Sequence, residues 1–346
     1  MDCRPNPIHS RLSRPWLHLL LLLGLAMAAA PLHAANETPA GSDIAALDLR
    51  VATLGEALAV AAHGLCSGPV ARTGMDLHSR AQYGRLTAQQ AAAMFPAANG
   101  VAVLLVVPGS PADRAGLRSG DGLIAMDGVP VPVTAASARP DYASTRDALD
   151  RLDAALADGV ARLHVRRSDG SDHQLVLHGI NGCPTRFQMD PGGGFEALAD
   201  GLYVRIGQTM VETAADDDVL AASIAHELAH NILHHRQRQN AAGMRRGLAR
   251  MFGRSAALSR AAEAEADRLT PWLMARAGRD PGAALVWLDL LQSRIGPSAP
   301  THPSWARRRA IINEQLPLIA ARIAEERSLD PPFDTINPGP LVPDGE

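Results

Sequence analysis

Two histidines and a glutamate stand at a spacing that suits metal-assisted hydrolysis. His226 and His230 bracket Glu227 in a run whose apolar residues recur every three or four positions, which is typical of a helix. On a helix the two histidines lie one turn apart on one face, so both imidazoles can bind the same Zn²⁺ ion. Glu227, rotated by about 100° from His226, can act as general base toward a water that the metal activates. These residues are the first candidates for a catalytic zinc site.

A catalytic zinc site needs a third protein ligand, and the chain offers one downstream. Glu263 and Asp267 are four residues apart, so they share one face of a helix. Glu263 can complete a His₂Glu site, while Asp267 can accept a hydrogen bond from the outer nitrogen of a ligand histidine. Glu265 points elsewhere and is expected to be solvated. The longer motif with a third histidine fails, because Arg236 stands at the required position.

A third motif, Thr301-His302-Pro303 followed by Arg308, extends this pattern. The three motifs in this order resemble the family-48 zinc metallopeptidases, the gluzincins that include HtpX-like and CAAX prenyl protease-like enzymes. The resemblance covers residues 183 to about 327. It implies a zincin-like fold and zinc-dependent endopeptidase activity, with one Zn²⁺ per subunit.

Several residues near these motifs keep more than one interpretation. His302 can donate a hydrogen bond to the oxyanion of the tetrahedral intermediate, or occupy a fourth zinc position in a resting state, or simply precede Pro303 at a helix start. Arg308 is expected to pair with a carboxylate of the site or with the substrate carbonyl. His234 and His235 are assigned to the negative end of the active-site helix rather than to the metal.

The elements that must position these residues follow from the apolar spacing. We predict a first helix over residues 43–66, an active-site helix from Asp217 to His235 with Asp216 as its N-cap, and almost continuous helix to Glu326. The resemblance to zincin-like folds implies that the stretch 195–201 is an edge strand along which an extended substrate lies. A tail over residues 330–346, rich in proline, is predicted to be disordered.

Between the first helix and this region the chain becomes rich in short β-like runs, glycine and proline. The segment 100–128 resembles the core of PDZ domains of bacterial proteases, and the resemblance extends over residues 68–180. It implies that amides near Gly74 hold a chain-terminal carboxylate, while the strand from Met75 accepts a peptide as an added strand. The alternative is a PDZ-shaped spacer with a closed groove.

The first 35 residues read as a cleavable secretory signal, with arginines before an apolar stretch of 15 residues and a small-residue exit. The mature protein is then expected to be exported, soluble and periplasmic. Two cysteines remain, Cys66 and Cys183, and an oxidising compartment favours a disulfide over two buried thiols. These cysteines bracket the β-rich insert, so a bond between them would staple its two ends.

Composition excludes several classes of mechanism and partner. All 33 residues counted as Lys+Arg are arginine, which excludes any chemistry that needs a lysine amine. A net charge of -3 and 3% aromatic residues argue against nucleic acid as a partner. A basic stretch over residues 236–260 has two interpretations, contact with an anionic membrane surface or a solvated loop over the cleft.

We therefore predict an α+β protein in which a mainly helical, zincin-like (gluzincin) peptidase domain carries an inserted β-rich PDZ domain. Its expected function is that of a zinc metalloendopeptidase in envelope protein quality control, acting on protein or peptide substrates that the PDZ domain recruits. The competing interpretation is a non-catalytic, zinc-containing holdase that binds peptides. The presence of Glu227 favours catalysis, because a purely structural zinc needs no acid-base carboxylate.

Overall fold

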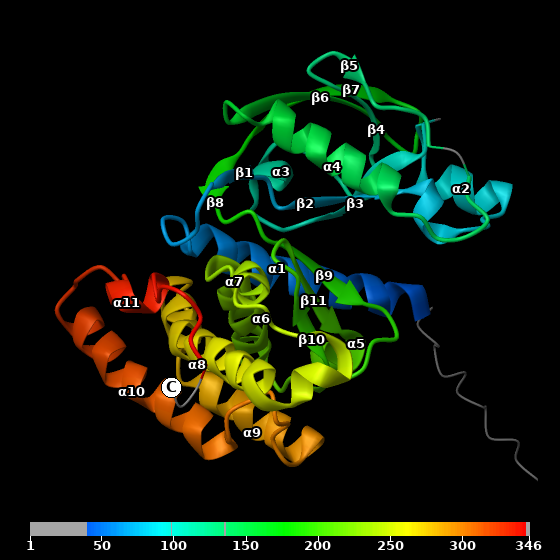
Figure 1. Ribbon diagram of the computed structural model, residues 1–346. Helices are drawn as coiled ribbons and strands as arrows, with labels where there is room; N and C mark the ends of the chain where they lie inside the picture. Colours follow the sequence, from blue (N-terminus) through cyan, green and yellow to red (C-terminus); the bar gives the residue numbers. More distant parts are fainter. Residues whose placement is uncertain (1–39, 98, 135, 344–346) are drawn as a thin grey trace, which may run out of the picture. The chain divides into compact units, whose positions relative to one another are not determined.

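The computed structural model describes residues 40–343 except residues 98 and 135 (Figure 1). The predicted secretory signal lies outside the described residues. The chain forms a mainly helical region that starts with one helix, is interrupted by a β-rich insert, and then continues to the C-terminal part of the chain. Among the described helices, none combines the length and the apolarity that a membrane span requires.

The elements of the helical region carry the numbering of Figure 1. They are α1 (Ala40–Ala61), β9 (Arg186–Asp190), β10 (Ala197–Ala199), β11 (Tyr203–Gly207), α5 (Gln208–Thr213), α6 (Asp217–Ile232), α7 (His235–Ala241), the 3-10 helix η2 (Gly247–Met251), α8 (Gly253–Arg276), α9 (Ala283–Ile295), α10 (Trp305–Ala324) and α11 (Phe333–Ile336). The longest of these helices are α1, α6, α8 and α10.

Helix α6 lies at the centre of this region and packs against α1, α8 and α9. Its apolar residues join one buried cluster with Leu54 of α1, Trp272 of α8 and Leu288 of α9. The all-round burial of α6 explains why it is apolar on more than one face, because helices surround it instead of solvent. A helix held in this way provides a rigid support for the two histidines that it carries.

The start of the active-site helix agrees with the sequence prediction, but its end does not. Asp216 caps α6 by accepting a hydrogen bond from the backbone N–H of Val219 at 2.9 Å. The helix ends at Ile232 rather than at His235. His234 adopts a left-handed backbone conformation with φ of 53°, which breaks the helix and lets α7 begin in a new direction. His235 therefore does not lie at the end of α6.

A small sheet borders the helices, with the strand order β10-β11-β9. Strands β11 and β9 are parallel, whereas β10 pairs antiparallel with β11 in the register Leu198 to Arg205. β10 is an edge strand, as predicted for this stretch of the sequence. Its free edge offers backbone groups to an added strand.

The insert contains a second hydrophobic core of its own. Its elements are β1 (Val70–Arg72), β2 (Met75–Ser79), the 3-10 helix η1 (Arg80–Tyr83), α2 (Ala88–Met94), β3 (Val101–Val106), α3 (Pro111–Arg114), β4 (Gly122–Met126), β5 (Val129–Pro130), α4 (Ala143–Ala155), β6 (Val160–Arg166), β7 (Asp172–His178) and β8 (Ile180–Gly182).

The strands of the insert form an antiparallel sheet in the order β2-β3-β4-β6-β7, with β5 paired to β4. Helix α4 buries Ala148, Leu149 and Leu152, whose spacing places them on one face of the helix. The β4–β5 hairpin turns through Asp127 and Gly128, both at positive φ, and this pair suits a tight two-residue turn.

The two ends of the insert are joined twice. β1 pairs antiparallel with β8, and beside this pair Cys66 forms a disulfide with Cys183, with a Cα separation of 5.7 Å. The structure therefore contains the disulfide expected from the sequence, at the point where the chain leaves and re-enters the helical region. In the chain-entropy model a bond that closes a loop of this length stabilises the fold by about 4–5 kcal/mol.

The prediction of a disordered tail is wrong for residues 330–343. This stretch includes helix α11, and Leu341 is buried in a small cluster with Leu258 and Ala262 of α8. Asp330 also forms an ion pair with Arg276 at 2.6 Å. The prolines prevented a helical pattern in the sequence, but apolar contacts with α8 hold the segment in place.

Candidate metal centre

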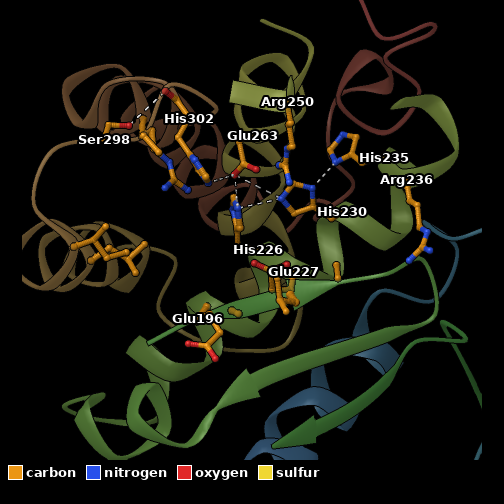
Figure 2. Close-up of a pocket in the computed structure, with 18 of the residues that line it drawn as sticks. Glu196, His226, Glu227, His230, His235, Arg236, Arg250, Glu263, Ser298 and His302 are labelled. Carbon is orange, nitrogen blue, oxygen red and sulfur yellow. Dashed lines mark hydrogen bonds and ion pairs between the residues drawn. The ribbon is translucent and has the colours of Figure 1, made fainter. Parts of the chain in front are cut away.

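Three side chains from two helices converge on one point of a cleft in the helical region (Figure 2). His226 and His230 come from α6 and Glu263 comes from α8. His226 Nε2 lies 3.2 Å from both His230 Nε2 and Glu263 Oε2, and the same carboxylate oxygen lies 3.7 Å from His230 Nε2. The structure thus brings together the three residues predicted as zinc ligands.

On one side of this cluster, a buried ion pair backs the first histidine. Asp267 Oδ1 lies 3.3 Å from His226 Nδ1. Arg308 donates two hydrogen bonds to Asp267, at 2.8 and 2.7 Å. Both members of the pair are almost fully buried. Of the two roles predicted for Arg308, the structure shows the pairing with a carboxylate, which leaves its two donors engaged away from a substrate carbonyl.

On the other side, the second histidine is supported by residues that sequence reasoning placed elsewhere. His230 Nδ1 lies 2.8 Å from His235 Nδ1, and His235 Nε2 lies 2.8 Å from Glu265 Oε2. Arg238 donates to both oxygens of Glu265. His235 is buried, so its assignment to the dipole of α6 is wrong. Glu265 is not a solvated carboxylate, because the turn at His234 brings α7 back over α8.

These contacts allow both histidines to carry their proton on Nδ1, which leaves the Nε2 atoms free to bind a cation between the three side chains. Asp267 can accept a hydrogen bond from a protonated His226 Nδ1, and His235 Nδ1 can accept one from His230 Nδ1 while its own Nε2 donates to Glu265. Both Nε2 atoms then direct lone pairs toward the same point as the Glu263 carboxylate. Two lone pairs and a negative charge facing each other are the donor set that Zn²⁺ binds.

The electrostatics of the site also favour positive charge. Burial lowers the pKa of His226, but hydrogen bonding to Asp267 and Glu263 outweighs burial and raises this pKa to about 9. Burial raises the pKa of Glu263, yet the neighbouring histidines His230 and His302 hold it well below its ordinary value. The cavity thus stabilises cationic partners and keeps its carboxylate ionised.

Glu227 lies beside the three candidate ligands in the same cleft. Figure 2 shows its carboxylate below the two histidines, toward the strand that follows Glu196, and it lines the cleft. Burial is the largest influence on it and raises the pKa of its carboxyl above the ordinary value. A raised pKa makes this carboxylate a stronger base near neutral pH, which suits proton transfer.

His302 lies at the rim of the cluster. Its Nε2 is 3.6 Å from Glu263 Oε2, and its Nδ1 is 3.0 Å from the hydroxyl of Thr301. It does not belong to the group of side chains whose ligand atoms lie within 4.8 Å of one another. His302 thus lines the cleft beside the ligands, and its roles as hydrogen-bond donor, fourth ligand or helix-entry residue stay predictions.

The surrounding cleft has a volume of about 740 Å³. Its walls include the edge strand β10, helix α9 and the basic stretch after α6, from which Arg236, Arg246 and Arg250 reach the cavity. The basic stretch therefore borders the cleft, as one of its two predicted interpretations requires. Leu248 and Phe252 are 85% and 72% exposed in the same stretch, and contact with a membrane stays a prediction.

The predicted peptide-binding groove of the insert is narrow. Gly74, at φ of +70°, and Met75, at the start of β2, line a cavity of about 80 Å³ that α1 and β9 also border. The side chain of Arg72 is held by Glu56 and by the backbone carbonyls of Cys183 and Thr185.

Comparisons with known proteins identify the insert. The PDZ domain family matches residues 103–167. The chain contains a PDZ domain. Over 38 residues in the PDZ region it is 47% identical to "Putative serine protease HhoA" of Synechocystis sp. (strain ATCC 27184 / PCC 6803 / Kazusa). That match covers 11% of this chain and 10% of the relative, so the chain spans about a tenth of the relative's length.

Both matches fall in the PDZ region, so neither bears on residues 183–327. The chemistry of the cleft is that of the residues that line it.

Proposed function

We propose that this protein is an exported zinc metalloendopeptidase that hydrolyses peptide bonds in proteins. The observation that carries the proposal is the convergence of His226, His230 and Glu263 on one point, with Glu227 beside them in the same cleft. The serine protease named among the relatives resembles this chain in the PDZ region only, so its reaction is not carried over.

Each residue of the cleft has a defined task in this proposal. His226, His230 and Glu263 would hold Zn²⁺, which when bound supplies Lewis acidity that polarises a carbonyl and activates water at neutral pH. Glu227 accepts a proton from the attacking water at its carboxylate and returns it to the leaving amine. His302 donates a hydrogen bond to the oxygen on which negative charge develops.

The buried pairs around the ligands keep this arrangement rigid. Asp267, itself fixed by Arg308, orients His226, and His235 with Glu265 orients His230. Such supporting contacts set the tautomer of each ligand histidine and raise its basicity. The free edge of β10 can align an extended substrate along the cleft.

Two further parts of the proposal concern the cell rather than the cleft. The Cys66–Cys183 disulfide supports an oxidising compartment, in agreement with the export predicted from the first 35 residues. Recruitment of unfolded chains through the PDZ domain, and hence a role in envelope protein quality control, is an analogy with other PDZ-containing proteases.

The experiment compares casein cleavage by the wild type and Glu227→Gln, with bound zinc measured in both. We expect the substitution to lower the cleavage rate by about 10²–10⁴-fold with zinc content unchanged, because only the proton acceptor is removed. Glu314→Gln, an exposed position on α10, is the matched control and should cleave at the wild-type rate. Equal cleavage by wild type and Glu227→Gln would exclude the mechanism; zinc binding without cleavage by any form would favour the holdase.

A further inference from the structure

The walls of the cleft differ sharply in charge. On the side formed by α7 and the segment that follows it, Arg236, Arg246 and Arg250 reach the cavity. On the side of α9, the lining side chains are Trp287, Leu291 and Ile295. A polypeptide in this cleft therefore meets arginines on one wall and apolar side chains on the other. Along the cleft, Arg236 and the acidic Glu196 lie on opposite sides of Glu227 (Figure 2).

Within the described part of the chain, no carboxylate forms an ion pair with the three arginines at the cleft wall. Arg246 donates to the side-chain oxygen of Asn240 at 2.6 Å and Arg250 donates to the hydroxyl of Ser259 at 3.1 Å, both of which are uncharged partners. Among the residues that the structure describes, none forms a hydrogen bond or ion pair with Arg236.

The sequence explains this lack of counter-charges. Residues 228–262 include seven arginines and no aspartate or glutamate. Arg238, another arginine of this stretch, does pair with a carboxylate, and that carboxylate, Glu265, comes from α8. The guanidinium groups at the cleft are therefore available to bind carboxylates of another chain, which they can do in a two-pronged way.

The edge strand indicates which end of a substrate meets these arginines. An extended peptide added to the free edge of β10 gains the better ladder if it runs antiparallel. Because β10 runs from Ala197 to Ala199, the N-terminal part of such a peptide lies toward Gly201 and its C-terminal part toward Glu196. A Cβ atom placed on Gly201 would lie 3.9 Å from Cδ of Arg236, so Arg236 stands at the N-terminal end.

Asp200, the acidic residue next to Gly201, does not form an ion pair with Arg236. Asp200 accepts the backbone N–H groups of Leu202 and Tyr203, at 3.0 and 2.8 Å, and so its oxygen faces the β10–β11 turn. Glu196, at the other end of β10, is exposed and lines the cleft. The two ends of the substrate path thus carry opposite charge.

We infer that the cleft selects polypeptide segments with acidic side chains on the N-terminal side of the scissile bond, bound chiefly by Arg236 and Arg246. The inference rests on the proposed peptidase function for the position of the bond, but the binding preference itself follows from the charges alone. Electrostatic complementarity of this kind sets specificity and association rate.

The test uses three fluorogenic peptides with the same apolar core. One has three glutamates N-terminal to the core, one has three lysines there, and one has the three glutamates C-terminal to the core. For the wild type we expect kcat/KM to be at least about tenfold higher for the first peptide than for either of the others. This ratio should shrink in about 1 M salt, where the screening length falls to about 3 Å.

Charge reversal then identifies the residues responsible. Arg236→Glu and Arg246→Glu should each bring the ratio between the glutamate and lysine peptides close to one. Both positions are exposed, so the fold should tolerate the change, and thermal unfolding checks this. Arg327→Glu, an exposed arginine after α10, is the matched control and should leave the ratio unchanged.

A binding measurement separates this inference from the proposed chemistry. Fluorescence anisotropy of the same labelled peptides with the Glu227→Gln variant reports occupancy without turnover. Tighter binding of the first peptide supports the inference if this preference is lost when Arg236→Glu is added to the variant. The inference then holds even if the wild type cleaves no peptide. Absence of cleavage would count only against the proposed peptidase function. Equal binding of glutamate and lysine peptides, or a preference for C-terminal glutamates, would overturn the inference.

Discussion

The cleft and the PDZ domain accommodate buried ionisable side chains in opposite ways. Around the candidate metal centre, Asp267 meets two hydrogen-bond donors of Arg308 as well as an imidazole. In the PDZ domain, Asp76 accepts a hydrogen bond from the backbone N–H of Leu77 and lies near another carboxylate, Asp48. His78 bonds only to the hydroxyl of Tyr83 among the described residues, and its Nε2 atom is buried without a partner there.

The pKa values follow this difference. Burial raises the pKa of Asp76 to about 6 and lowers the pKa of His78 to about 4, so both groups move toward their neutral forms. Burial also raises the pKa of Asp267, but the charge of Arg308 outweighs it and the net shift is downward. Partners of opposite charge therefore shift the pKa of a buried group toward its charged form, whereas burial without them shifts it toward the neutral form. Such a network suits the binding of a cation, whereas isolated groups serve packing.

The largest expected effect tests the charged network directly. Asp267→Asn removes the counter-charge of Arg308 and leaves a buried guanidinium without a carboxylate. We expect the free energy of unfolding to fall by about 3–5 kcal/mol, measured by urea denaturation of the metal-free protein. Asp217→Asn, which breaks an exposed ion pair with Arg50, should cost less than about 1 kcal/mol. Similar costs for the two substitutions would contradict the contrast between buried and exposed pairs.

A second experiment tests whether the residues behind His230 increase the affinity of the site for zinc. His235→Ala removes the acceptor of the outer nitrogen of His230. We expect zinc affinity to fall by about 10–100-fold, measured by competition with a chromophoric chelator, because the ligand loses its orientation and part of its basicity.

The neighbouring histidine provides a matched control. His234 bonds to the hydroxyl of Ser67, away from the ligands, so His234→Ala should bind zinc as the wild type does. An unchanged affinity in His235→Ala would show that the contact between the two rings does not support the site.

The smallest expected effect is in the PDZ domain, where a substitution should increase the free energy of unfolding instead of lowering it. The pKa of Asp76 is raised from 3.8 to about 6 in the folded state, so folding favours its protonated form. Its contribution to stability is complete below about pH 4 and is lost as pH rises through 6. Such a shift in pKa corresponds to roughly 3 kcal/mol, but Asp76 is only half-buried and solvent screening reduces this value. Asp76→Asn should therefore increase the free energy of unfolding at pH 7.5 by about 1 kcal/mol and change it little at pH 4. A loss of stability at pH 7.5 would mean that the charged form is the stabilising one.

Much of the architecture could be predicted from local patterns. The spacing of His226, Glu227 and His230 needs only a helix to place two imidazoles on one face, and the apolar residues around them make that helix. The PDZ domain was predicted from its glycine-rich turns, and the comparison with its family confirmed it. The pairing of Cys66 with Cys183 followed from their even number and from their positions around the insert.

The errors arose where the backbone changes direction. A helix that continued to His235 would have pointed this side chain away from His230, and the left-handed conformation of His234 reverses that outcome. Glu265 looked solvated because its partners come from α7, which returns over α8 only in the folded chain. The prolines of the tail predict disorder, whereas in the fold Leu341 packs on Leu258 and Ala262 of α8 and Ile336 packs against the main core.

The sequence by itself determined which residue types stand one helical turn apart, and so which side chains are able to share a metal ion. Tertiary structure decided what lies behind each ligand and what charges line the cleft. Helical spacing is a property of neighbours in the chain, whereas the pKa of a buried group depends on partners that only folding brings within a few ångströms. The arginines at the cleft show both aspects, since the lack of acidic residues between 228 and 262 is visible in the sequence and their position in one cleft with β10 is visible only in the fold.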